Sequence, residues 1–146
     1  MSTKLPSISV RNLQRAVKID CANLEKFAKE ALGFCLRLKK TVPTELTSSR
    51  EISVLLVSDR RMTRLHRKFL SKSGTTDVLT FQHGEIVVSV EMAARNARRF
   101  KSSLREELRL YLVHGLLHLH GFDDQSGADA RKMGVAQKRI LQRATR

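Results

Sequence analysis

Two histidines four residues apart, His114 and His118, are the residues of this sequence best placed to do chemistry. They lie in a segment from Leu108 to Leu119 that is otherwise almost entirely apolar, and a helix that is apolar on every side is a buried helix. Positions four apart differ by about 40° around a helix axis, so both imidazoles project from one face. Two buried imidazoles without polar partners would cost about 1–3 kcal/mol each. The pattern therefore predicts a partner that satisfies both rings.

A divalent metal ion is the partner that fits this spacing best. Zinc binds imidazole nitrogen at about 2.0–2.1 Å, and histidines at i and i+4 are a common helical pair of zinc ligands. Catalytic zinc sites generally use three protein ligands and leave one position for water. Gly121 lets the chain fold back after the helix, and Asp124 follows it. We predict one zinc ion per chain, held by His114, His118 and Asp124, with the metal-bound water as the only catalytic group that can be named.

The alternative is a pair of structural histidines hydrogen-bonded to their neighbours, with Asp124 only capping the next helix. A bare H-x-x-x-H pair favours that interpretation, because short motifs often match by chance. The glycine and the carboxylate at a suitable distance downstream favour the metal. The other three histidines are predicted to be surface or internally hydrogen-bonded residues, since one lies about 200° around the helix from His118 and two stand alone in their segments: His120, His66 and His83.

The residue after the first histidine bears on which reaction such a metal would serve. Helical zinc peptidases carry a glutamate there as general base, whereas this chain has Gly115. A metallopeptidase is therefore the least favoured function. Zinc can instead polarise a phosphoryl oxygen and lower the pKa of its bound water to about 7, which fits phosphodiester cleavage. The sequence does not identify a general acid.

The charge of the chain predicts a polyanionic partner. Lys and Arg number 28 against 14 Asp and Glu, a net charge of +14, which indicates RNA, DNA or an anionic membrane surface. No apolar run approaches the ~18 residues that span a bilayer, and the start lacks a signal-peptide pattern, so a membrane is disfavoured. Six Phe, one Tyr and no Trp argue against a base-stacking platform. We expect RNA to be held mainly through its backbone and shape, although the same charges would also keep a small domain soluble.

The surrounding segments alternate between strand and helix patterns, which indicates one α+β domain over residues 1–146 with a mixed sheet. About four strands are predicted, at 8–13, 52–57, 78–81 and 86–90. Four or five helices are predicted, among them 22–33, a helix capped by Asp59 and running to about 70, 104–120, and a last helix capped within 126–129 and running to about 143. Ser103-x-x-Glu106 has the form of a capping box for the histidine-bearing helix, and Gly121 suits its end.

The two cysteines favour a reducing compartment. Cys21 and Cys35 fall in a predicted helical segment, where fourteen residues span about 21 Å, well beyond the ~7 Å limit for a disulfide. We therefore predict two free thiols in a cytoplasmic protein. Beyond the metal, no small-molecule cofactor is predicted, and the sequence does not indicate an oligomeric state.

Three blocks of the sequence resemble motifs of the YbeY family of bacterial endoribonucleases. The block at 114–124, HGLLHLHGFDD, is similar to the family pattern H-G-x-L-H-L-x-G-[YF]-D-H. The block at 76–81, TDVLTF, resembles T-D-V-L-S-F, and the block at 84–91, GEIVVSVE, resembles G-D-I-x-I-S-x-E. The resemblance covers about 52–124 in the correct order.

This resemblance implies a zinc-binding α+β fold with a zincin-like metal helix. It also implies a cytoplasmic endoribonuclease that matures ribosomal RNA, chiefly the 3′ end of the small-subunit RNA, and acts in ribosome quality control. Two positions depart from the family pattern. Asp124 stands where the family has its third histidine ligand, so we expect altered affinity or metal preference. Leu70 stands where the family has an arginine linked to activity, and Lys72 is close enough in sequence to replace it in part.

Basic residues before the second block are the candidates for RNA contact: Arg67, Lys68 and Lys72. The resulting hypothesis is a metal-dependent endoribonuclease specific for single-stranded RNA. The alternative is a non-catalytic RNA-binding or ribosome-associated factor whose metal is structural and whose Leu70 marks lost chemistry.

Overall fold

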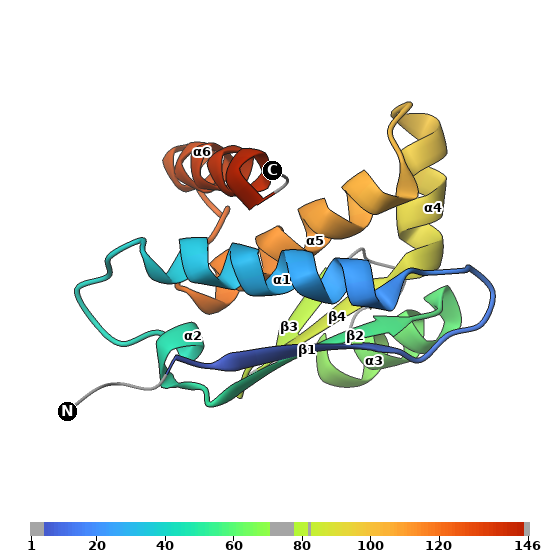
Figure 1. The fold of residues 1–146 in the computed structure, drawn as a ribbon, viewed down its shortest axis with the longest axis horizontal. Coiled ribbons are helices and arrows are strands. Elements are labelled where there is room, and N and C mark those ends of the chain that lie inside the picture. Colours follow the sequence, from blue (N-terminus) through green and yellow to red (C-terminus); the bar gives the residue numbers. More distant parts are fainter. Residues whose placement is uncertain (1–4, 71–77, 82, 145–146) are drawn as a thin grey trace.

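Four strands rich in apolar residues form one sheet, whose ribbon is drawn in Figure 1. The structure is a computed structural model that describes residues 5–70, 78–81 and 83–144, with only the backbone of Phe69 and Leu70. The strand order is β1-β2-β4-β3; β1, β2 and β4 are parallel, and β3 is antiparallel to β4. The strands are β1 (Ser7–Asn12), β2 (Glu51–Val57), β3 (Val78–Phe81) and β4 (Glu85–Ser89). The predicted mixed sheet of four strands is confirmed.

Six helices accompany the sheet in the part of the chain that the structure describes: α1 (Cys21–Leu36), α2 (Glu45–Ser48), α3 (Asp59–Leu70), α4 (Val90–Arg99), α5 (Leu104–Leu119) and α6 (Gly127–Ala144). The sequence patterns gave no bounds for α4, and the helix that they missed altogether is α2. It is a single turn, too short to show helical periodicity, and it is held by a capping box between Thr44 and Thr47.

The two faces of the sheet carry different helices. On β2, Ile52, Val54 and Leu56 point into the main core formed with α1 and α5. Because side chains alternate along a strand, Leu55 and Val57 point to the other face, where they pack with residues of α3. Helix α6 packs outside the sheet against both α1 and α5 (Figure 1). The helix that carries His114 and His118 therefore lies between the sheet and α6.

Both ends of α5 follow the sequence prediction. The Ser103 hydroxyl accepts a hydrogen bond from the Glu106 amide at 3.1 Å, which caps the first turn. Gly121 has φ +88°, the left-handed conformation that ends a helix and favours glycine. In the middle, a Cβ on Gly115 would lie 2.7 Å from Cγ2 of Ile86 on β4, so this glycine lets α5 lie close against the sheet.

The start of α3 differs from the prediction that Asp59 caps it. The cap is Ser58, whose hydroxyl accepts from the Arg61 amide at 3.2 Å. The Asp59 carboxylate accepts instead from the Ser89 hydroxyl at 2.7 Å and from Arg95. Burial raises the pKa of Asp59, but the hydrogen bonds from Arg95 and Ser89 outweigh it and leave this pKa below its usual value. Asp59 thus joins α3 to the start of α4 rather than closing its own helix.

Neither cysteine forms a disulfide, as predicted. Cys35 lies fully buried against the core, and this burial raises the pKa of its thiol to about 12. No helix among the described residues is both long and apolar enough to cross a bilayer.

Candidate metal centre

The structure brings the three predicted ligands together at the C-terminal end of α5. The Nε2 atoms of His114 and His118 lie 3.0 Å apart, with the two rings at 81° to each other. Asp124 lies in the loop that follows the helix, and one ligand atom from each residue falls within 4.8 Å of the others. Both histidines are half-buried, whereas Asp124 is exposed. The group is therefore open to solvent on its carboxylate side, as a catalytic metal site requires.

When both rings are neutral, the hydrogen bonds of the two imidazoles place their ring protons on Nδ1 and leave the facing Nε2 atoms to accept. The Nδ1–H of His118 donates to the carbonyl oxygen of Phe122 at 3.1 Å, because a carbonyl only accepts. The Nδ1–H of His114 donates to Oε1 of Gln137 at 3.0 Å. In a neutral imidazole with a protonated Nδ1, Nε2 carries a lone pair. Two lone pairs thus face each other at 3.0 Å, an arrangement that a shared cation would stabilise.

The electrostatics of His118 favour the neutral form that a metal requires. Burial lowers the pKa of His118 most, and the neighbouring His114 lowers it further; Asp124, the Phe122 carbonyl and Asp123 oppose this shift without cancelling it. A neutral imidazole is the form that binds a metal ion. Tetrahedral coordination with bonds of about 2.0–2.1 Å separates two ligand nitrogens by about 3.3 Å, close to the observed 3.0 Å. The donor set of two imidazoles and a carboxylate fits zinc or a similar divalent ion.

In the structure Asp124 does not cap the last helix, which contradicts that part of the alternative interpretation. Helix α6 begins at Gly127, and its cap is Ser126, whose hydroxyl accepts from the Asp129 amide at 3.0 Å. The neighbouring Asp123 accepts from the Gln125 amide at 3.0 Å. Asp124 therefore has no capping role, and its carboxylate is the one that approaches the two histidines.

Two groups that orient the ligands were not found by sequence reasoning. One is the carbonyl of Phe122, and the other is the amide of Gln137 on α6. Metal-bound histidines commonly donate their second ring N–H to such a group, which fixes the tautomer and the ring orientation. Gln137 lies 23 residues from His114 along the chain. No spacing rule in the sequence connects the two residues, so only the packing of α6 on α5 reveals this contact.

The third histidine of the helix is not part of the group. His120 is buried, and its Nε2–H donates to the Leu38 carbonyl at 2.6 Å while its Nδ1 accepts from the Thr44 hydroxyl at 3.0 Å. Two environments were predicted for His120. The internal, hydrogen-bonded environment is therefore correct, and the surface environment is wrong. The two hydrogen bonds of this histidine join the end of α5 to the segment around α2.

The two predicted RNA contacts that the structure describes lie apart from the metal group. Arg67 and Lys68 are exposed on α3, which covers the opposite face of the sheet from α5. Lys72 lies outside the described residues, as does the side chain of Leu70. The role of these residues stays a prediction. Gly115, where a peptidase would need its glutamate, sits against β4 with no room for a side chain.

Comparison with known proteins identifies relatives along nearly the whole chain. The sequence model of the family described as Endoribonuclease YbeY matches residues 9–145. Endoribonuclease YbeY of Syntrophotalea carbinolica is 30% identical over 151 residues, which cover 93% of this chain and 94% of the relative. The protein of the same name from Thermodesulfovibrio yellowstonii is 28% identical over 92% of this chain and 95% of the relative.

Other relatives are more similar over a shorter stretch. Endoribonuclease YbeY of Anaeromyxobacter sp. (strain Fw109-5) is 45% identical over 93 residues, which cover 57% of this chain and 48% of the relative. The chain thus spans about half the length of this relative. The solution structure of a protein from Thermotoga maritima matches with a TM-score of 0.66 at 25% identity, covering 94% of this chain and 88% of that one.

Proposed function

Because this chain belongs to the YbeY family of endoribonucleases, we propose that it is a zinc-dependent endoribonuclease that cuts single-stranded RNA. Its proposed substrate is ribosomal RNA in the cytoplasm, chiefly the 3′ end of the small-subunit RNA, with a role in ribosome quality control. The observation that supports this most directly is the pair of Nε2 atoms 3.0 Å apart with Asp124 beside them.

In this proposal the chain's own residues hold and orient the ion. His114, His118 and Asp124 would bind it, while Phe122 and Gln137 keep the two rings turned so that their lone pairs converge. When bound, a divalent ion supplies Lewis-acid chemistry, polarising a phosphoryl oxygen and lowering the pKa of water. The +14 net charge attracts the RNA backbone. Arg67, Lys68 and Lys72 are proposed to hold the strand.

The test measures metal content and RNA cleavage on the same preparation. We expect about one zinc ion per chain by elemental analysis, and fragments from an unstructured RNA oligonucleotide that disappear when a chelator is added. His114→Gln should abolish both metal binding and cleavage. The matched control is His66→Gln, which removes a histidine of α3 that is not in the metal group and should retain both. The same RNA annealed to its complement should stay intact.

Two outcomes would contradict the proposal. A folded chain that binds no divalent ion would remove the metal centre. A chain that binds both metal and RNA, yet leaves the RNA intact at every metal loading, would favour the alternative of a non-catalytic RNA-binding or ribosome-associated factor. In that case Leu70, at the position of the family's arginine, is the first residue to replace with arginine.

A further inference from the structure

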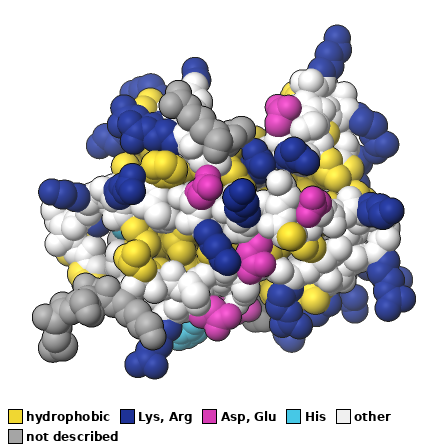
Figure 2. All heavy atoms as spheres, viewed as in Figure 1, with side chains coloured by type: hydrophobic (Ala, Val, Ile, Leu, Met, Phe, Trp, Pro, Cys, Tyr) yellow, Lys and Arg dark blue, Asp and Glu magenta, His cyan; other side chains and the backbone are white. Residues whose placement is uncertain are grey.

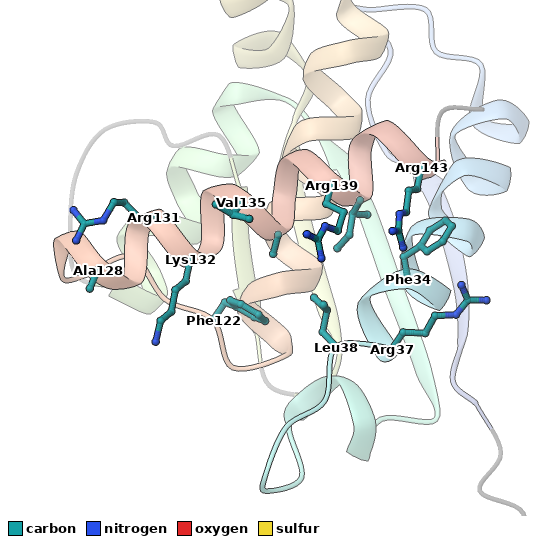
Figure 3. Close-up of a pocket in the computed structure, with 12 residues that line it drawn as sticks. Phe34, Arg37, Leu38, Phe122, Ala128, Arg131, Lys132, Val135, Arg139 and Arg143 are labelled. Carbon is teal, nitrogen blue, oxygen red and sulfur yellow. The ribbon is translucent and has the colours of Figure 1, made fainter.

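A groove separate from the metal centre lies between the C-terminal end of α1, Phe122 and the outer side of α6 (Figure 3). It encloses about 790 Å³, within the range of small-ligand sites. Its apolar surface includes Phe34, near the end where Arg143 lies, Phe122, nearer the middle, and Val135, which is 64% exposed on α6. An exposed Val135 beside two half-buried phenylalanine rings indicates a surface that can bind an apolar group of a ligand.

The rim of this groove is strongly basic. Five cationic side chains line it and none of its described lining residues is acidic: Arg37, Arg131, Lys132, Arg139 and Arg143. The four on α6 are exposed. Figure 2 shows basic side chains gathered over α6 with apolar surface beside them. Like charges of this density repel one another, so the groove is complementary to a ligand that carries several negative charges and also has apolar faces.

Two contacts join the groove to the metal centre. The ring of Phe122 lines the groove, while the carbonyl of the same residue accepts the hydrogen bond from His118. Helix α6 carries the groove's cations on its outer side, and its Gln137 accepts the hydrogen bond from His114. The groove and the metal centre are therefore neighbours that share Phe122 and α6.

We propose that this groove binds single-stranded RNA, with phosphates on the α6 cations and unpaired bases on the apolar floor. The inference rests on the proposed function and deepens it, because it names a path for the substrate on one side of the metal centre. A duplex hides its base faces and would meet only the cations. A bilayer surface is flat, whereas the groove is concave. Contact of bases with Phe34 and Phe122 favours a single strand, in contrast to the sequence-based expectation that RNA is held mainly through its backbone. Each phosphate contact on a single strand steepens the plot of log K against log salt by about 0.7.

The test measures binding without cleavage, so that it does not depend on catalysis. A fluorescein-labelled single-stranded RNA of about twelve nucleotides is titrated with the full chain in EDTA, at several KCl concentrations. Arg139→Gln/Arg143→Gln should raise Kd about tenfold near 100 mM salt and lower the slope of log K against log salt by about 1.4, twice the contribution of one contact. The matched control is Arg98→Gln/Lys138→Gln, which removes the same charge from exposed positions outside the groove and should change Kd much less.

A second variant tests the apolar floor. Val135→Ser should raise Kd for single-stranded RNA several-fold without changing the salt slope, because it removes apolar contact and no charge. It should leave duplex RNA binding unchanged. Since Val135 is exposed, the fold should not be affected, which circular dichroism checks.

The outcomes separate this inference from the proposed function. Groove variants that bind RNA as tightly as the control pair would overturn the inference, even if the chain cuts RNA. Binding to phosphatidylcholine–phosphatidylglycerol vesicles, or to an acidic peptide, that the groove variants lose while RNA binding persists would overturn it in favour of that partner. A chain that cuts no RNA but loses RNA binding only in the groove variants would support the groove and contradict the nuclease.

Discussion

At the scale of single residues, the chemistry depends on where two imidazole protons sit. His118 is fixed by a backbone carbonyl, which can only accept, so its tautomer follows from the fold of the loop after α5. His114 depends on a side chain, the amide of Gln137, which reaches it from α6. The two ligands therefore differ in how firmly their rings are held. A substitution that removes the Gln137 contact should reveal this difference between the two ligands.

Replacing Gln137 with leucine should weaken zinc binding without removing any ligand. The leucine cannot accept from the Nδ1–H of His114, so the ring loses both its orientation and its preferred tautomer. Loss of such a partner typically costs 10–100-fold in metal affinity, and we expect a change of about this size. Competition with a chromogenic zinc chelator measures it. Gln142→Leu, an exposed position on the same helix, is the control, and an equal loss in both variants would contradict the role of Gln137.

At the scale of elements, α5 acts as a platform that is fixed at several points. Ser103 caps its start, His120 is hydrogen-bonded to Leu38 and Thr44 at its end, and Gly115 lets its middle lie against Ile86. These restraints involve three different parts of the chain. They hold the histidine pair in place on a helix rather than on a loop, which suits a site whose ligand atoms must converge within a few tenths of an ångström.

The close contact at Gly115 can be tested by adding one methyl group. Gly115→Ala places a Cβ 2.7 Å from Cγ2 of Ile86. Overpacking of this kind costs about 1–3 kcal/mol, which should outweigh the gain of up to about 1 kcal/mol in helix propensity. Gly134→Ala on α6 is the matched control, because its Cβ would meet nothing within 4 Å. We expect urea denaturation to show a destabilised Gly115→Ala and an unchanged or stabilised Gly134→Ala. Stabilisation of both would contradict the close packing of α5 on β4.

Sequence reasoning succeeded where the relevant residues lie close together along the chain and failed where they do not. The spacing of His114, His118 and Gly121 within one helix and its end predicted the group that the structure brings together, including Asp124. Gln137 could not be predicted, since its contact depends on how α6 packs. The sequence shows that the last helix is basic but does not show what its cations surround. Only the packing of α6 beside Phe34 and Phe122 turns them into the rim of a groove.

Local signals also misled where two structures compete for one side chain. Asp59 stands where an N-cap is expected, but it lies opposite Arg95 and Ser89 in space, and the charged contact outweighs the cap. Ser58, one residue earlier, takes the capping role. Likewise the one-turn helix α2 left no periodic pattern, although it supplies the Thr44 that holds His120.

At the scale of the whole molecule, the core does not depend on the metal centre. Apolar residues from β1, β2, β4, α1, α5 and α6 form one large cluster, and α3 closes a second cluster on the other face. The histidine pair is only half-buried, beside this core rather than inside it. A fold of this kind should persist without the ion, in contrast to small zinc domains that unfold when the metal is removed.

Chelation should therefore lower the thermal stability of the chain but not unfold it. An ion that binds only the folded state adds about 2.7 kcal/mol at a free concentration 100 times its Kd, which corresponds to about 5–10 °C in Tm for a chain of this size. We expect EDTA to lower Tm by about this amount while the far-ultraviolet circular dichroism at 25 °C stays unchanged. His118→Ala should show the lower Tm with or without zinc, because it lacks a ligand. Loss of helical signal on chelation would instead mean that the metal is structural, and would favour the non-catalytic alternative.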